Sequence, residues 1–261
     1  MSTPLEGVRE AYDASASAWA AGPGSAYDAM ADVLLAAAPG QVRGATVLDL
    51  GTGTGPAARA ARRAGAARVV GIDISSQMLV EGSGWDSVVV GDVTRLPIRD
   101  GCFDLTVAAC CLGHLPDPHT ALVETRRVAV SVVASAFLAG WTHPAKSRVD
   151  AVAARHGFVT PAWYSRLKAD VEPTIDDPGS LDALARAAGY LSVEVTTTLV
   201  DVGVRTPDQL VTWRLGMAHL APFVATLDPA QLIALRAECV DAVADAPPLV
   251  VPLVILAASD G

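Results

Sequence analysis

The hydrophobic and polar positions of the first half of the chain alternate between short apolar runs and amphipathic segments. Five apolar runs have the length of strands: 46–50, 68–72, 87–90, 103–109 and 132–138. Three intervening segments have the period of helices: 56–63, 76–81 and 120–128. Strands that are apolar throughout and separated by helices are typical of a parallel sheet covered on both faces. The pattern predicts an α/β fold with a doubly wound, Rossmann-like, mostly parallel sheet.

The second half has a different pattern. It predicts helices at 147–156, 162–169 and 180–188, then strands at 192–200 and 249–257. Between these strands, two helical faces repeat apolar residues: Leu210, Trp213, Met217 and Leu220 on one, and Leu232, Leu235, Cys239 and Val243 on the other. We expect an antiparallel last strand and a helical lid inserted at about 203–247.

Four regions follow from these patterns. Residues 1–44 are alanine-rich, with a Gly-Pro-Gly break at 22–24, and predict two short helices that form an N-terminal cap. Residues 45–139 form the core of the sheet, and 140–191 form a helical segment. Residues 192–261 supply the last two strands and the lid.

Composition narrows the class of protein. Of the 261 residues, 51 % are hydrophobic and 18 % charged, which indicates a folded globule. The net charge of −9, without any basic run, disfavours a nucleic-acid partner. The uncharged window 128–145 contains serine, glycine and proline, so we interpret it as a buried strand and expect no membrane partner. We see no secretory signal at 1–22, and four cysteines without metal-ligand spacing predict reduced thiols in the cytoplasm.

The stretch VLDLGTGTG at 47–55 places Gly51, Gly53 and Gly55 between a strand and a helix. Such a turn presents free backbone N–H groups to a ligand. A dinucleotide fingerprint needs a glycine at the sixth position, where this chain has Pro56. A phosphate-binding P-loop is excluded because no Gly-Lys-Ser/Thr follows. The run therefore predicts a nucleotide-type ligand of another kind.

Three carboxylates come at the ends of three successive strands: Asp49, Asp73 in VVGIDIS and Asp92 in VVVGDV. The carboxyl ends of parallel strands meet at one edge of the sheet. A rim of carboxylates repels pyrophosphate and suits a nucleoside that carries positive charge, such as a sulfonium with an amino group. Asp73 has the spacing of a carboxylate that binds ribose hydroxyls. Asp49 either contacts the ligand or ties the loop through backbone N–H groups.

In these features the chain resembles the class I S-adenosylmethionine-dependent methyltransferases, and among them the small-molecule enzymes of the ubiquinone and menaquinone biosynthesis type. The resemblance runs through VLDLGTGTG (47–55), GIDISSQML (71–79), GDVTRLPIRDGCFDLTVAACCLGHLPDP (91–118) and RRV (126–128), and is weak outside 45–128. It implies S-adenosylmethionine as cofactor, S-adenosylhomocysteine as product and no metal. It also implies that the loop holds the methionine part, Asp73 the ribose, Met78 the adenine face, and Asp92 with Val93 the adenine edge.

The predicted cofactor site is completed by neighbouring positions. It comprises Asp49, Gly51, Thr52, Gly53, Gly55, Asp73, Ile74, Met78, Asp92, Val93, Ala109 and His114, with Tyr12 and Trp19 closing over it from the N-terminal side. One departure concerns the turn before the fifth strand. Relatives usually carry Pro-Gly-Gly there, whereas RRVAVSVVASAF runs straight on in this chain.

Catalytic residues are less clearly marked. His114, placed by the resemblance beside the methyl group, either takes a proton from the acceptor or only hydrogen-bonds the loop or the cofactor. His143, beyond the fifth strand, is a second candidate base. Asp104 and Asp117 are interpreted as structural, Asp117 as a helix cap. The adjacent Cys110 and Cys111 would face opposite sides of a strand and fill it rather than act as nucleophiles.

The predicted substrate pocket consists of residues beyond position 140: Trp141, His143, Trp163, Tyr164, Trp213 and His219. These side chains either line an apolar pocket or attach helices to the sheet. The favoured function is methyl transfer to an oxygen, nitrogen or carbon atom of a small, partly apolar metabolite, by a monomer or homodimer. Two alternatives stay open: a non-methylating reaction of cyclisation type on the same fold, and a macromolecule methyltransferase.

Overall fold

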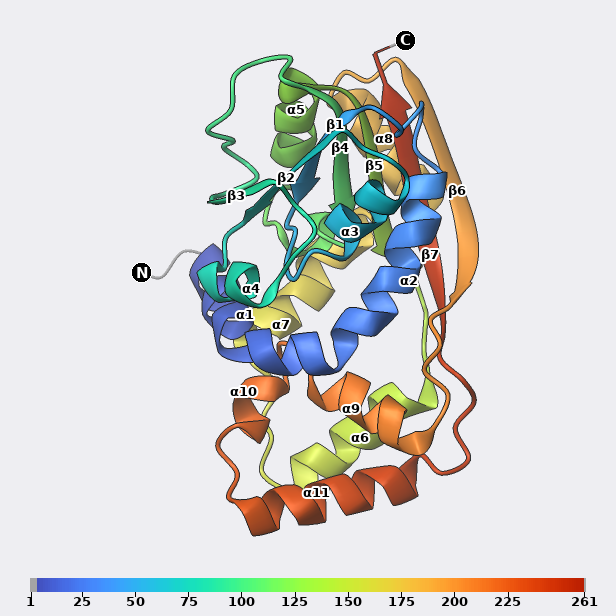
Figure 1. The fold of residues 1–261 in the computed structure, drawn as a ribbon. Helices are drawn as coiled ribbons and strands as arrows, with labels where there is room; N and C mark the ends of the chain where they lie inside the picture. Colours follow the sequence, from blue (N-terminus) through green and yellow to red (C-terminus); the bar gives the residue numbers. More distant parts are fainter. Residues whose placement is uncertain (1–3, 261) are drawn as a thin grey trace.

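Seven strands form one sheet in the computed structural model, which describes residues 4–260 (Figure 1). The strands are β1 (Thr46–Leu50), β2 (Arg68–Asp73), β3 (Ser87–Val90), β4 (Phe103–Ala109), β5 (Ala129–Phe137), β6 (Ser192–Asp201) and β7 (Val250–Ser259). Their order is β3-β2-β1-β4-β5-β7-β6. The first five strands pair in parallel, and β7 lies antiparallel between β5 and β6. The predicted doubly wound sheet with an antiparallel last strand is confirmed.

Helices cover the two faces of this sheet. On one face lie α2 (Pro23–Ala36) and α3 (Pro56–Arg63), and on the other α5 (Pro118–Val128) and α8 (Pro178–Ala187). Alternate strand residues divide between the two cores, since Val47 packs with the first pair and Leu48 with the second. This alternation explains why the central strands are apolar along their whole length.

The remaining helices gather beyond the carboxyl ends of the parallel strands. They are α1 (Pro4–Ala21), α4 (Ser76–Glu81), α6 (Pro144–Arg155), α7 (Ala162–Arg166), α9 (Pro207–Leu215), α10 (Ala221–Val224) and α11 (Pro229–Ala242), with short 3₁₀ turns at Leu112–His114 and Glu172–Thr174 and a π turn at Leu167–Val171. In Figure 1, α6, α9 and α11 stack below the sheet, with α11 outermost. The lid inserted between β6 and β7 consists of three helices, α9, α10 and α11, rather than the expected pair.

Local sequence explains where these elements begin and end. The side chain of Asp117 accepts a hydrogen bond from the Thr120 N–H, so its predicted role as a helix cap is confirmed, and α5 begins at Pro118. Asp104 accepts hydrogen bonds from the backbone and hydroxyl of Thr46, which joins β4 to β1. At the position of the missing Pro-Gly-Gly turn, α5 ends at Val128 and β5 begins at the next residue.

The structure corrects three details. The N-terminal helices are long rather than short, with 18 residues in α1 and 14 in α2. The strand β3 is exposed along its whole length, because it is the edge of the sheet and no helix covers it. Cys110 and Cys111 follow β4 instead of belonging to it, and Cys110 has a positive φ of 52°. All four cysteines are free.

None of the helices within residues 4–260 is both long and apolar enough to cross a membrane.

Candidate functional site

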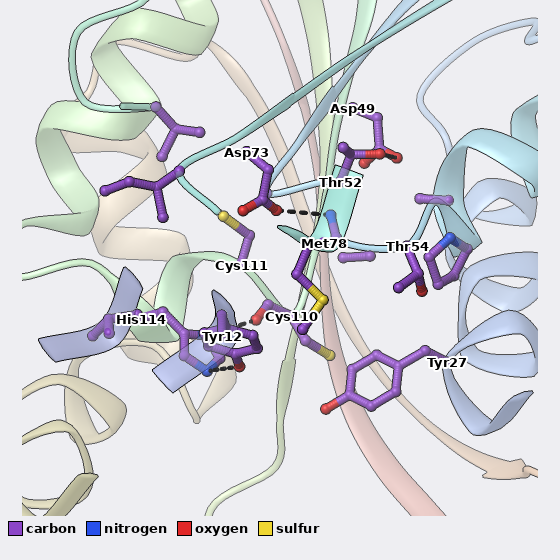
Figure 2. A pocket seen from close by; sticks show the side chains of 18 of the residues that line it. Tyr12, Tyr27, Asp49, Thr52, Thr54, Asp73, Met78, Cys110, Cys111 and His114 are labelled. Carbon is purple, nitrogen blue, oxygen red and sulfur yellow. Dashed lines mark hydrogen bonds between the residues drawn. The ribbon is translucent and has the colours of Figure 1, made fainter. Parts of the chain in front are cut away.

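A first cavity opens at the carboxyl ends of β1, β2 and β4 (Figure 2). Its floor is the glycine loop after β1, and Asp49, Asp73 and Asp92 all line it. Helix α1 covers it with Tyr12 and Trp19. The structure brings together every residue predicted for the cofactor except Gly55.

The glycines of this loop are required by its geometry. Gly51 has φ of 59°, and a Cβ there would lie 2.5 Å from the Cys111 sulfur. Gly53 also has a positive φ, of 56°, and its N–H points at a carboxylate. Gly55 has a different role. It begins α3 with φ of 86°, and a Cβ would lie 1.9 Å from the Ser83 carbonyl oxygen. Gly55 therefore packs against a neighbouring loop and lies outside the cavity, which corrects the prediction that it contacts the cofactor.

Asp73, the last residue of β2, fastens the loop to the sheet. Its Oδ2 accepts the Gly53 N–H at 2.7 Å and its Oδ1 accepts the Ser75 N–H at 2.8 Å. Burial raises the pKa of this carboxyl, and the backbone hydrogen bonds oppose the rise. Each carboxylate oxygen can accept a further hydrogen bond. Asp73 is thus placed to receive a pair of hydroxyl groups.

Asp49 lies deeper in the same cavity and has only 1 % of its surface exposed. Its Oδ2 accepts the Thr52 hydroxyl at 2.6 Å. Burial raises the pKa of this carboxyl to about 7, although its hydrogen bonds with Thr52 and Ala58 act in the opposite direction. Asp49 combines the two roles left open by the sequence: it ties the loop and also faces the cavity.

Thr54 shows where a ligand is expected. Its side chain is 4 % exposed and lines the first cavity. Within the described chain, its buried hydroxyl oxygen has no hydrogen-bond partner. Buried hydroxyls are nearly always hydrogen-bonded, so an unpaired one in a cavity marks a position that a ligand can satisfy.

A second cavity is lined by residues of β5, α6, α7 and α9 and shares part of its lining with the first. Among the residues predicted for a substrate pocket, those that line it are Trp141, Trp163, Tyr164, Trp213 and His219. Phe137 stacks on Trp141 with ring centroids 5.3 Å apart, and Tyr164 stacks on His219 at 4.0 Å. The cavity therefore has flat, largely aromatic walls.

Tyr12, Tyr27, Cys110 and His114 line both cavities and form the wall between them. The ring of His114 is fixed at both nitrogens. Nδ1 lies 3.1 Å from the Cys110 carbonyl oxygen, to which it must donate, so Nε2 accepts the Tyr12 hydroxyl at 2.9 Å. Burial lowers the pKa of His114, so the ring is a neutral imidazole. Of the two roles open for His114, this geometry favours hydrogen bonding over proton abstraction.

His143 is not part of either cavity. It caps α6, where Nδ1 accepts the Ala145 N–H at 3.1 Å and Nε2 donates to the Pro247 carbonyl oxygen at 3.1 Å. Both nitrogens have backbone partners and the side chain is buried. The predictions of His143 as a base and as a pocket residue are therefore wrong, because a capping motif accounts for this histidine.

Sequence reasoning missed the charged residues of the second cavity: Lys146, Lys168, Glu172, Asp176 and Arg214. Position alone could have indicated Lys146, since the segment after a central strand lies at the ligand-binding edge of such a sheet. Lys168 lies in the π turn after α7, which no sequence pattern marks. Throughout the described ranges, no group of three or more histidine, cysteine or acidic side chains is placed to hold a metal ion.

Comparison with known proteins agrees with this geometry. Residues 48–131 match the family model described as a methyltransferase domain. A 37.1 kDa protein of transposon Tn4556 from Streptomyces fradiae is 38 % identical over 95 residues, which are 33 % of this chain and 27 % of that protein. Demethylmenaquinone methyltransferase of Streptomyces avermitilis is 39 % identical over 85 residues, 31 % of this chain and 36 % of the enzyme. The chain thus spans about a third of the length of these curated relatives.

Solved structures resemble nearly the whole chain. One, described as a methyltransferase from an antibiotic biosynthesis pathway of Anabaena variabilis, has a TM-score of 0.59 at 12 % identity and covers 87 % of this chain and 95 % of its own. Another, the 4+2 cyclase SpnF, has a TM-score of 0.53 at 20 % identity and covers 89 % and 80 %. Residues 48–131 of this chain therefore match a methyltransferase domain, and the chain shares the Rossmann-like fold of these solved structures.

Proposed function

We propose that this protein transfers a methyl group from S-adenosylmethionine to an oxygen, nitrogen or carbon atom of a small, partly apolar metabolite. The observation that carries the proposal is the pair of adjoining cavities. The first has a glycine loop and three carboxylates, and the second has aromatic walls. Tyr12 and His114 stand where the two cavities meet.

The residues of the first cavity fit this cofactor. The carboxylate of Asp73 can accept two ribose hydroxyls, and Asp92, whose Oδ1 accepts the Thr94 N–H at 2.8 Å, keeps a second oxygen for an amino group. The unpaired hydroxyl of Thr54 suits a polar group of the methionine part. The buried carboxyl of Asp49 supports a ligand with positive charge. When bound, this cofactor supplies an electrophilic methyl group on a positively charged sulfur.

The residues of this chain contribute mainly position and exclusion of water. Displacement at a methyl carbon requires the acceptor atom in line with the leaving sulfur, and confinement in two joined cavities favours that alignment. Helix α1 is held over the first cavity by Asp13, which accepts the Ser75 hydroxyl at 2.7 Å. His114 holds the Tyr12 hydroxyl through Nε2 and is a positioning residue in this scheme.

Calorimetry and product analysis test the proposal together. The purified protein is titrated with S-adenosylhomocysteine, then incubated with methyl-deuterated S-adenosylmethionine and a panel of small phenols, amines and carboxylic acids. We expect saturable binding and at least one product that gains the labelled methyl group. Absence of binding would overturn the proposal.

A second candidate function is a cyclisation without methyl transfer. It is favoured by the commitment of both His114 nitrogens, which leaves that histidine without a free lone pair for deprotonating an acceptor. The resemblance to the 4+2 cyclase SpnF shows only that the two chains share a fold. Product mass decides between the two, because an isomer without the label supports cyclisation.

A further inference from the structure

Lys146 is a cation that lines the second cavity. It lies in the first turn of α6, where its ammonium is 4.3 Å from the centroid of the Trp141 ring and donates to the Trp141 carbonyl oxygen at 3.3 Å. Among residues 4–260, it forms no ion pair with a carboxylate. It lines the second cavity and not the first.

The other cations of this cavity differ in that respect. Arg214 is buried and binds Asp150 through Nε at 2.8 Å and Nη2 at 2.5 Å. Lys168 is paired with Glu172 four residues further along the chain. Their charges are balanced by carboxylates, whereas the charge of Lys146 is not. The cavity thus holds one uncompensated ammonium beside a flat aromatic surface.

Maintaining this ammonium is costly for the free protein. Burial, together with the nearby positive charges of Lys168 and Arg214, lowers the pKa of Lys146 to about 8, against the attraction of Glu172 and Asp150. A surface lysine of a protein with net charge −9 would find carboxylates easily. A half-buried lysine held away from them, over a tryptophan, is instead prepared for an anion that arrives with a ligand.

We propose that the second cavity selects acceptors that carry an acidic group on a planar, apolar body, with Lys146 pairing with that group. The planar body would lie against the stacked Phe137 and Trp141 rings. Asp176 also lines this cavity as a carboxylate, on a different segment, and a purely cationic acceptor would favour it instead. The proposal rests on the proposed function only in naming this cavity as the acceptor site.

Two isosteric probes separate charge from shape. They are 2-naphthoate, which carries a carboxylate, and 2-naphthamide, its neutral counterpart. Binding of each is measured by calorimetry to the wild-type protein, to Lys146→Met and to Arg148→Met. Arg148 is a matched control because it lies on the same helix but pairs with Asp245 outside the cavity. S-adenosylhomocysteine is titrated into each protein separately.

We expect wild-type protein to prefer 2-naphthoate by about tenfold, the value of one charge-assisted contact. The preference should vanish in Lys146→Met and persist in Arg148→Met. Equal affinities for the two probes in the wild type, or an unchanged preference in Lys146→Met, would overturn the proposal. If Lys146→Met does not fold, Lys146→Gln takes its place.

The proposed function and the proposed role of Lys146 can be refuted independently. Loss of S-adenosylhomocysteine binding in the wild type refutes the proposed function, whatever the naphthoate preference. Normal S-adenosylhomocysteine binding without that preference refutes the role of Lys146 alone.

Discussion

The two cavities of this protein are built by different means. The first is formed mostly by the ends of β1, β2 and β4 and the loops that follow them, and Tyr12, Trp19 and Tyr27 of α1 and α2 complete its lining. Its carboxylates are tied by hydrogen bonds to the loop that they support, as Asp73 is to Gly53. The second is made of long aromatic and charged side chains from α6, α7, the π turn and α9.

This difference has a functional consequence. A site formed by strand ends and backbone N–H groups keeps its shape when surface residues change, which suits a ligand that stays the same. A site formed by side chains on separate helices can change its specificity by single substitutions. Under the proposed function, the chain joins a fixed cavity for the cofactor to an adaptable cavity for the acceptor.

The largest effect is expected from a substitution of Asp73 in the first cavity. Asp73→Asn removes one acceptor oxygen and places an NH₂ group against the N–H groups of Gly53 or Ser75. Loss of a charge-assisted hydrogen bond to the ligand, with a distorted loop, should weaken S-adenosylhomocysteine binding about 100-fold in calorimetry.

Asp104→Asn is the matched control for this substitution. Asp104 bonds Thr46 at the opposite end of the strands and lies outside both cavities, so the affinity should not change. An Asp73→Asn protein that folds and keeps its affinity within about twofold would contradict the assignment of Asp73 to the ribose.

The second prediction concerns charge and pH. Burial raises the pKa of the Asp49 carboxyl to about 7, so Asp49 binds a proton as pH falls through neutrality, and burial shifts the pKa of Asp73 in the same direction. A cationic ligand favours the ionised carboxylates, so its binding must weaken as they become protonated. We expect the affinity for S-adenosylmethionine to fall about tenfold from pH 7.5 to 6.

The comparison ligand is S-adenosylhomocysteine, which lacks the positive sulfur and should show a shallower pH dependence by calorimetry. In Asp49→Asn the dependence for S-adenosylmethionine should also become shallower. If the affinity for S-adenosylmethionine fell more steeply toward high pH than toward low pH, the carboxylates of this cavity would not attract the positive charge of the ligand.

The different ways in which the two cavities are formed also explain which features could be predicted from the sequence. The sheet and the first cavity follow from local patterns: apolar strands, glycines that need a positive φ, and carboxylates at strand ends. Asp73 and Asp92 were found because the fold itself puts strand ends together. The edge strand β3 was predicted with its correct bounds, but its exposure was not predicted, because Val88, Val89 and Val90 have the same composition as a buried strand.

The second cavity could be predicted only in part, because its members meet through tertiary packing. Aromatic residues such as Trp141 and Tyr164 were identified by composition and position. Lys146 and Arg214 were missed, since nothing local distinguishes a lysine over a tryptophan from a surface lysine. His143 was included because its two partners were not recognised: it caps α6 through the Ala145 N–H, and its other nitrogen bonds Pro247 on a distant segment.

The third prediction addresses the wall that the cavities share. Tyr12 and Tyr27 both line the two cavities, but only Tyr12 donates its hydroxyl to His114. Tyr12→Phe leaves the buried Nε2 of His114 without a partner and should lower the free energy of unfolding by about 1–2 kcal/mol in urea denaturation. Tyr27→Phe should change it by less than about 0.5 kcal/mol. Equal losses for the two substitutions would mean that the Tyr12–His114 bond does not stabilise the wall.

The smallest expected effect separates ligand binding from stability within the first cavity. The buried Thr54 hydroxyl has no partner among the described residues, so Thr54→Val should leave the free energy of unfolding unchanged or raise it by up to about 1 kcal/mol. If that hydroxyl bonds the cofactor, the same substitution should weaken S-adenosylhomocysteine binding about fivefold. Thr52→Val is the contrasting control, because it removes the 2.6 Å bond to Asp49 and should lower stability as well. A Thr54→Val protein that is less stable yet binds with unchanged affinity would place the hydroxyl's partner inside the protein. The first cavity would then be held together by all of its polar groups, and Thr54 would no longer indicate where the ligand lies.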